Sequence, residues 1–178
     1  MSTVLMIRVH EQPGGQLCRF KPKLRGDETE VRKLSVYREL HAWIYAEAEA
    51  SNVTMEAKGH VRGHLGQFVR GELIDDYYFM KRVEDRRFPM AMFSHGIWAI
   101  SPRFNPQYRF FGAFATHDWF VALNKQSRDA LEQSEACWHA EIDTSTKLWS
   151  DLFPGRPVFI GDTLGDFVSN AEKLDARW

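Results

Sequence analysis

Two histidines, His60 and His64, stand four residues apart in the segment GHVRGH. On a helix this spacing puts both imidazoles on one side, where they could hold a divalent metal ion. A complete site needs further ligands, and the glutamate that follows the first histidine of the zinc-protease motif is replaced here by Val61. The pattern therefore favours two structural histidines, and we expect neither a metal nor another cofactor.

Acidic pairs offer a second kind of chemistry. Asp75 adjoins Asp76, and Asp162 stands four residues before Asp166. Two neighbouring carboxylates can bind a cation or divide the roles of general acid and general base. Beside glycines and at the starts of helices, however, aspartates more often cap the helix or close a turn. We therefore interpret both pairs as structural.

The two cysteines add no further chemistry. Cys18 and Cys137 are far apart in the sequence, and neither belongs to a metal-binding spacing or a disulfide framework. His139 follows Cys137 by two residues, a spacing that puts the two side chains on different faces of a helix. No catalytic dyad is expected, and the cysteine usage favours a reducing, cytoplasmic location.

Length and composition are those of an ordinary globular protein. The chain has 178 residues, of which 44% are hydrophobic and 26% charged, and its formal net charge is -1. Such a chain can bury a core as a single domain over residues 1–178. A near-neutral charge gives no overall attraction to nucleic acid or anionic lipid, so any basic site must be local. The sequence starts without a secretory leader and holds no apolar run that could span a bilayer, so we expect a cytoplasmic protein without membrane contact.

The N-terminal half is expected to begin with a strand and continue mainly as helices. Weak alternation over residues 3–10 predicts the strand. Asp27 suits an N-cap, and helical spacing after it predicts a helix of about five turns. The buried side of that helix would carry Val31, Leu34, Leu40, Trp43 and Ile44. A second helix is predicted over residues 55–73, and a short helix or turn over residues 75–84.

Residues 97–125 carry the strongest pattern in the chain. Trp98 and Ile100 fall on one side of a strand, and Ile97 and Ala99 fall on the other. After the turn residues of SPRFNPQ, residues 108–115 alternate with apolar side chains on both faces, which indicates a central strand covered on both sides. A short connection leads to a third strand over residues 119–124. Together the three strands predict an antiparallel meander.

Helical spacing returns after Lys125. It predicts one long helix, or two helices broken near residues 143–144, ending before Pro154 and Gly155. Its apolar face would consist of Leu131, Trp138, Ile142, Trp149 and Leu152. The last residues indicate a loop or strand followed by a helix, and Trp178 is the best single candidate for an interaction anchor. The expected fold is α+β: a small antiparallel β-meander sheet packed against N-terminal helices, with an extra C-terminal helical region.

This order of elements resembles the core of a known protein family. A strand, two helices and a meander that reads apolar-Trp-x-Ile, turn, Tyr-Arg-Phe-Phe, turn, Phe-Val-Ala-Leu-x-Lys look like the RelE/ParE superfamily of toxins, particularly its HigB-like members. The resemblance covers residues 3–130, and the C-terminal helical region over residues 127–178 is additional. It implies a toxin-like effector acting on RNA or a nucleic-acid-associated target, with RNA or the ribosome and an antitoxin-like protein as partners.

The resemblance also implies a site. Family members commonly carry an arginine in the second meander strand, with basic residues after the third. The matching positions here, together with a cation in the preceding turn, are Arg109, Lys125, Arg128 and Arg103. If the protein is an enzyme, the resemblance implies a metal-independent endoribonuclease-like reaction. Such cleavage needs cations beside the scissile phosphate and a titratable acid or base, a role open to His117 or His95.

Two other functions stay open. A non-enzymatic protein-interaction domain, or a mobile-element accessory domain with a degenerate site, would have these cations scattered or paired with acids and an apolar patch exposed. A small-molecule or metal-binding protein would bring His60, His64 or the acidic pairs together in a pocket. The toxin-like hypothesis instead requires the cations to cluster in one open concavity.

Overall fold

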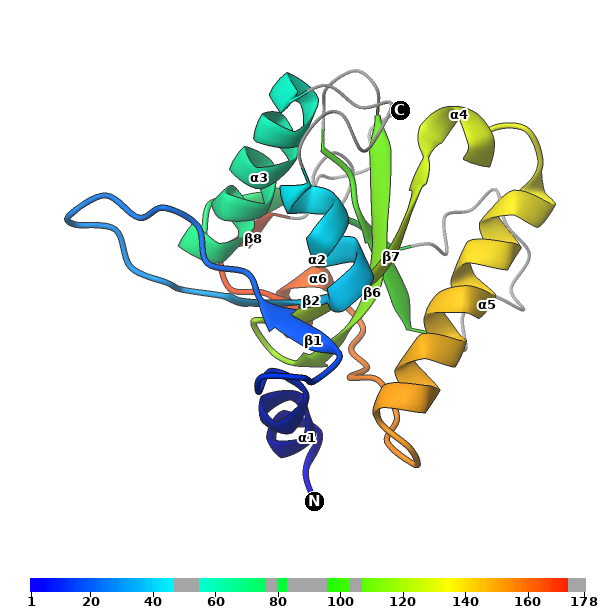
Figure 1. Cartoon of the computed structure of the whole chain (residues 1–178), viewed down its shortest axis with the longest axis horizontal. Coiled ribbons are helices and arrows are strands. Elements are labelled where there is room, and N and C mark those ends of the chain that lie inside the picture. Colours follow the sequence, from blue (N-terminus) through cyan, green and yellow to red (C-terminus); the bar gives the residue numbers. More distant parts are fainter. Residues whose placement is uncertain (47–54, 76–79, 83–95, 103–106, 173–178) are drawn as a thin grey trace.

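The computed structural model describes residues 1–46, 55–75, 80–82, 96–102 and 107–172 (Figure 1). A six-stranded mixed sheet runs through it in the order β1-β2-β7-β6-β5-β4. Its strands are β1 Leu17–Arg19, β2 Lys33–Tyr37, β4 Met80–Arg82, β5 Ile97–Ile100, β6 Tyr108–Thr116 and β7 Trp119–Ser127. Neighbouring strands are antiparallel, except that β2 and β7 are parallel. Four residues singled out by the sequence lie outside the described residues: Asp76, His95, Arg103 and Trp178.

Helices cover both faces of this sheet (Figure 1). One face carries α2 Arg38–Tyr45, α3 Met55–Arg70 and α6 Leu164–Phe167, and the other carries α1 Thr3–His10 and α5 Glu135–Leu152. The short helix α4, Arg128–Leu131, joins β7 to α5, and a small parallel pair is formed by β3 Ile74–Asp75 and β8 Ala171–Glu172. The arrangement confirms an α+β fold in which a meander packs against helices and a C-terminal helical region follows.

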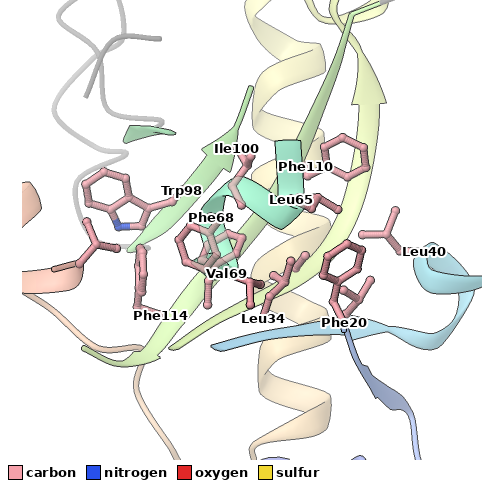
Figure 2. Packing of buried hydrophobic residues seen from close by; sticks show 14 of the residues in the cluster. Phe20, Leu34, Leu40, Leu65, Phe68, Val69, Trp98, Ile100, Phe110 and Phe114 are labelled. Atoms are coloured by element: carbon pink, nitrogen blue, oxygen red, sulfur yellow. The ribbon is translucent and has the colours of Figure 1, made fainter. Parts of the chain in front are cut away.

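The two faces of β6 supply two separate cores. Phe110 and Phe114 belong to the core on the α3 side, where Phe68 packs among them (Figure 2). Phe111 belongs to the core on the α5 side, and all four rings are fully buried. Burying one such ring contributes about 2 kcal/mol of hydrophobic stabilisation. The prediction of a central strand covered on both sides is confirmed.

The long periodic elements are as the sequence predicts. β5, β6 and β7 form the antiparallel meander, although β7 continues to Ser127. The second predicted helix is α3, which ends at Arg70 because Gly71 takes up a φ of 79°, a conformation suited to a helix end. α5 is unbroken through residues 143–144, but the predicted helical segment is divided at residues 132–134, between α4 with Leu131 and α5, whose start the Ser134 hydroxyl caps. It ends at Leu152, before Pro154 as predicted.

The predicted first strand is wrong, because residues 3–10 form helix α1. The Ser2 side chain accepts a hydrogen bond from the Leu5 backbone N–H at 3.3 Å and caps the helix. Ile7 is buried against the sheet, whereas Leu5 and Val9 face outward. Over so few residues, weak apolar alternation does not separate a strand from a helix with one buried position per turn.

The predicted five-turn helix is wrong over its first half. Residues 33–37 form β2, and only residues 38–45 are helical. Leu34 and Val36 enter one core, and Ser35 faces the other side, where it accepts a hydrogen bond from the Trp119 indole. Backbone pairing with β1 and β7 holds this strand, so tertiary pairing overrides the local helical spacing. Asp27, the predicted N-cap, lies in the loop before β2.

The helix or turn predicted over residues 75–84 is wrong wherever the structure describes it. β3 ends at Asp75, and β4 spans Met80–Arg82. β4 pairs antiparallel with β5 and so extends the meander to the edge of the sheet. Residues 76–79 and 83–84, including Asp76 of the first acidic pair, lie outside the described residues.

Candidate nucleic-acid interface

Three of the predicted cations, Arg109, Lys125 and Arg128, lie at one end of the sheet, where β6 begins and β7 ends. There Arg109 pairs with Gln126 across the two strands, and Phe110 pairs with Lys125. Arg128 follows directly as the first residue of α4. Residues directly opposite each other on paired strands share a face of the sheet. This register therefore decides whether each cation lies on the α2 and α3 face or on the α5 face.

A β-bulge in β7 decides the direction of Lys125. Phe111 pairs with Asn124 and Gly112 pairs with Ala122, so Leu123 is an extra residue on β7. Leu123 and Asn124 consequently both face α5. The next residue, Lys125, is thereby turned to the α2 and α3 face, beside Trp43. Strict alternation from Leu123 would have placed Lys125 on the α5 face instead.

On the α2 and α3 face, two lysines and two aromatic rings form what we call the lysine–aromatic cluster: Trp43, Lys58, Tyr108 and Lys125. Lys125 Nζ lies 4.3 Å from the centroid of the Trp43 ring and 5.2 Å from that of Tyr108. Lys58 Nζ lies 5.6 Å from the Trp43 ring, and the two ring centroids are 5.0 Å apart. Cations at these distances are attracted to the negative face of an aromatic ring.

Lys58 is the unusual member of this cluster, because its residue is 0% exposed. Its ammonium donates to the backbone carbonyl of Ala46 at 2.9 Å, while Arg62 donates to that of Ile44 at 3.0 Å. Both cations therefore satisfy carbonyls at the C-terminal end of α2, where the helix dipole is negative. Among the residues that the structure describes, neither Lys58 nor Lys125 forms an ion pair with a carboxylate.

The surroundings change the acid–base properties of the cluster. Burial lowers the pKa of Lys125; the Glu141 carboxylate acts against this shift, and the nearby Lys58 ammonium adds to it. Burial raises the pKa of the Tyr108 phenol, which therefore stays protonated at neutral pH. The site holds two cations that repel each other at the edge of an apolar core.

The arginines belong to the opposite face of the sheet. The Arg109 guanidinium is half-buried and donates to the carbonyl of Tyr108 at 3.3 Å. Burial lowers the pKa of Arg109, the neighbouring Arg128 adds to the shift, and Glu132 opposes it. Arg128 itself is exposed, lies 2.5 Å from Glu132 and donates to the Gln107 side chain at 2.9 Å. The arginine pair is thus partly neutralised.

A carboxylate network fixes the α5 side of this sheet end. Both oxygens of Glu141 accept side-chain amide hydrogen bonds, one from Asn124 at 2.7 Å and one from Gln126 at 3.0 Å. Ser145 donates to the Asn124 carbonyl oxygen at 2.7 Å. These contacts tie α5 to the strand just beyond the bulge, so they hold Asn124 and Gln126 on one face and Lys125 on the other.

His117 lies at the far end of the same hairpin, in the turn between β6 and β7. Its Nδ1 is 3.1 Å from Asp118 Oδ2. At roughly 3.3 Å per residue, the nine-residue strands separate this turn from the cation end by roughly 25 Å. The structure therefore does not bring the predicted titratable group to the predicted cations.

Sequence reasoning identified Lys125, Arg109 and Arg128 but missed Trp43, Lys58 and Tyr108 as members of one site. One signal was available for Lys58. It shares the buried side of α3 with Val61 and Leu65, three and seven residues later, which is unusual for a lysine. Its proximity to Lys125 depends on the packing of α3 against the sheet and could not be read from the sequence.

The metal-binding and acid-pair patterns give no site in the described part of the chain. His60 lies on the exposed side of α3, 3.8 Å from Glu56. Asp166 accepts backbone N–H groups of Thr163 and Asp162 at 2.7 and 2.9 Å, so it caps α6, and these bonds lower its pKa. Over the described ranges, no three His, Cys, Asp or Glu residues are grouped so that they could hold a metal ion. No helix in those ranges is long and apolar enough to cross a membrane.

We compared the chain with protein-family models, with curated proteins and with solved structures, and none of the three comparisons found a match. What the geometry offers is a pair of lysines that lack a carboxylate partner among the described residues, set beside aromatic rings, with two arginines around the edge of the same strands.

Proposed function

We propose that the protein is a RelE/ParE-like effector that binds RNA at the cation end of β6 and β7. The observation that carries the proposal is the lysine–aromatic cluster. Lys58 is fully buried, yet its described partners are a carbonyl, an indole ring and a second cation. Buried charges are normally paired, and an anionic ligand group beside Lys125 would add a negative charge next to the two lysines, neither of which forms an ion pair with a carboxylate among the described residues.

Phosphate is the anion best suited to this position. Lysine ammonium groups bind phosphate as point charges, and a polymer of phosphates would also reach the arginines around the strand end. Arg109 is the neighbour of Tyr108 in β6, so the two cation groups are separated only by the thickness of the sheet. The overall charge of -1 makes such binding local rather than diffuse.

The order of elements gives separate support. β2 is followed by two helices, α2 and α3, and then by the meander that ends in β7. This is the order on which the resemblance depends, with β2 taking the place of the strand expected at residues 3–10. The parallel pairing of β2 with β7 brings the first and last strands of this unit together.

The proposal concerns RNA binding first, because His117 lies far from the cluster. Fluorescence anisotropy with a labelled single-stranded RNA tests it. Lys125→Ala should weaken binding about fivefold to tenfold, the effect typical of one lost phosphate contact. Lys147→Ala is the matched control, since Lys147 is 76% exposed and paired with Asp151 on the far side of α5. Equal RNA affinities of the two variants would refute the proposal.

The effector part of the proposal is tested in cells. Expression of the wild type in a bacterial host should arrest growth, and the double variant Arg109→Ala, Arg128→Ala should not. RNA extracted from both cultures shows whether arrest is accompanied by cleavage. Equal growth with intact RNA binding in vitro would leave a binding protein without effector activity.

A protein-interaction domain is the second candidate, favoured by the outer side of α1. Met1, Leu5 and Val9 recur every four residues and are 69%, 47% and 54% exposed. An apolar stripe of this kind fits a groove of an antitoxin-like partner. Copurification with the product of a neighbouring gene, lost in Leu5→Asp with Val9→Asp, would support this function. Copurification unaffected by the double variant would exclude this stripe as the contact.

A further inference from the structure

We propose that the outer edge of β1 and the loop after it form a docking site for an extended acidic peptide, one with a carboxylate at every second position. The first observation is the place of β1 in the sheet. β1 is an outermost strand in the order β1-β2-β7-β6-β5-β4, and the loop of residues 20–32 continues it before returning to β2 (Figure 1). The outer edge of such a strand presents backbone N–H and C=O groups to an added strand.

The backbone hydrogen bonds of β1 decide which groups face outward. Gln16 accepts a hydrogen bond from the first residue of α2 at 2.8 Å, and Phe20 donates one to β2 at 2.9 Å. Because alternate residues of an antiparallel strand bond to the same neighbour, the backbone groups of Arg19 and Lys21 face the open edge. Pro22, at the next inward position, has no N–H, so the pairing with β2 ends there.

Three exposed cations alternate along the loop: Lys21, Lys23 and Arg25. Over the described ranges, no hydrogen bond or ion pair involves Lys21 or Lys23, and none involves the Arg25 side chain. Pro22 packs against α3, where a Cβ added at Gly66 would lie 3.4 Å from the Pro22 Cβ. Its two lysine neighbours are thereby turned away from α3, roughly 6.6 Å apart along an extended chain.

The acids of the same loop hold it in place. The Glu28 carboxylate accepts a backbone N–H within the loop at 2.8 Å and lies 3.8 Å from the Arg70 guanidinium of α3. Glu30 pairs with Arg19 at the start of the loop, and Asp27 lies in the turn at its tip. Since two of the three carboxylates brace the loop, the row of cations stays available to an anionic partner.

An extended acidic peptide matches both the edge and the cations. Its side chains repeat every second residue, at the spacing of the cation row, so carboxylates on one face would lie directly opposite the cations. Main-chain hydrogen bonds to Arg19 and Lys21 would add affinity without sequence preference. A second copy of this edge would place cations against cations, and lysines on a strand edge also disfavour a neutral strand. The edge therefore selects an acidic strand.

Backbone methylation gives a matched pair of probes. Each glutamate of the added strand would lie opposite an outward-facing residue, so its N–H would face β1, whereas the intervening N–H groups would face away. The probe is a fluorescein-labelled peptide that alternates glutamate with threonine and valine, titrated with the full-length protein. N-methylation of its glutamates should weaken binding about tenfold, and N-methylation of the other residues should change binding less than about twofold. Equal affinities of the two methylated peptides, or no binding of the unmodified peptide, would overturn the proposal.

Two double variants of equal charge separate this edge from general electrostatics. Lys21→Gln with Lys23→Gln should weaken binding of the unmodified peptide about threefold to tenfold and leave the thermal unfolding temperature unchanged. Lys147→Gln with Arg156→Gln removes the same charge from exposed positions on α5 and just after it, and should not weaken binding. Equal effects of the two double variants would contradict the assigned site.

The inference is independent of RNA binding. RNA affinity should depend on Lys125 and not on Lys21 or Lys23, whereas peptide affinity should show the reverse dependence. Loss of RNA binding with unchanged peptide binding in the Lys21 and Lys23 variant would make this edge a nucleic-acid contact and would refute the peptide site. Both titrations use the same preparation, so failure of one proposal does not imply failure of the other.

Discussion

Two fully buried cations, Arg32 and Lys58, have opposite surroundings. Arg32 donates to the carbonyls of Phe68 and Glu72 at 3.1 and 2.9 Å and to that of Ser169, and its Nε lies 3.5 Å from Asp118. Lys58 has one carbonyl, an aromatic ring and another lysine. The first cation joins α3, the β6–β7 turn and the C-terminal segment, so its role is structural. Over the residues that the structure describes, the second forms no ion pair with a carboxylate, and the proposed RNA site depends on this difference.

The largest expected effect is the difference in stability between variants that lack one or the other of these two charges. Arg32→Met would remove the guanidinium donors of the Phe68, Glu72 and Ser169 carbonyls and the positive charge beside Asp118, and should lower the free energy of unfolding by about 3 kcal/mol. Lys58→Met loses one hydrogen bond but relieves repulsion with Lys125, so we expect a change below about 1 kcal/mol. Urea unfolding of both variants measures this. Losses of similar size would abolish the distinction.

The β-bulge that turns Lys125 to the α2 and α3 face can be disturbed by a substitution at Gly112. A side chain there would place its Cβ 2.0 Å from the Val121 carbonyl oxygen, so Gly112→Ala should destabilise the protein by about 2 kcal/mol and displace the strand end. Gly63→Ala is the control, because a Cβ at this helical position meets nothing within 4 Å and alanine is the better helix former. Thermal unfolding that ranks the two variants the other way would contradict the packing described.

A smaller effect is expected from pH on RNA binding. Burial lowers the pKa of Lys125 from the ordinary 10.5, and the ammonium is the form that binds phosphate. RNA affinity should therefore decline as pH rises, beginning below the range in which an exposed lysine loses its proton. Lys125→Arg keeps its charge throughout and should flatten this decline. An identical decline in the variant would assign the titration to another group.

The smallest expected effect is the pH dependence of stability that His41, a partly buried basic group, contributes. Burial and the neighbouring Arg38 lower its pKa below 6.5, so the folded state favours the neutral imidazole. The unfolded chain then binds more protons between the folded pKa and 6.5, and stability is lost as pH falls through that window. His41→Gln should reduce the acid loss, by less than about 1 kcal/mol, in urea unfolding at several pH values. An unchanged pH profile would contradict it.

Sequence reasoning succeeded where one period continued over many residues. The meander from Ile97 onward and the helices α3 and α5 each repeat their pattern often enough to be unambiguous. It failed in the first 45 residues, where α1, β2 and α2 are each eight residues or shorter. There, Ser2 capping and the parallel pairing of β2 with β7 decide the structure, and pairing between distant segments has no local signature.

The candidate site was predictable in part. Lys125 and Arg109 were identified through the family resemblance, but their separation onto opposite faces depends on one extra residue, Leu123, which shifts the alternation. Lys58 joins Lys125 only because α2 and α3 pack on that face, which brings both ammonium groups close to the Trp43 ring. A register shift and a helix-packing contact are properties of the folded chain.

The salt dependence of RNA binding tests the central claim most directly. Anisotropy titrations of single-stranded RNA at several salt concentrations give the slope of log affinity against log salt for the wild type and for the double variant Lys58→Met, Lys125→Ala. If this lysine pair neutralises phosphate, the slope should become shallower by about 0.7 to 1.4, the change expected for one or two lost phosphate contacts. An unchanged slope and affinity in the folded double variant would contradict the claim that the pair is a ligand site.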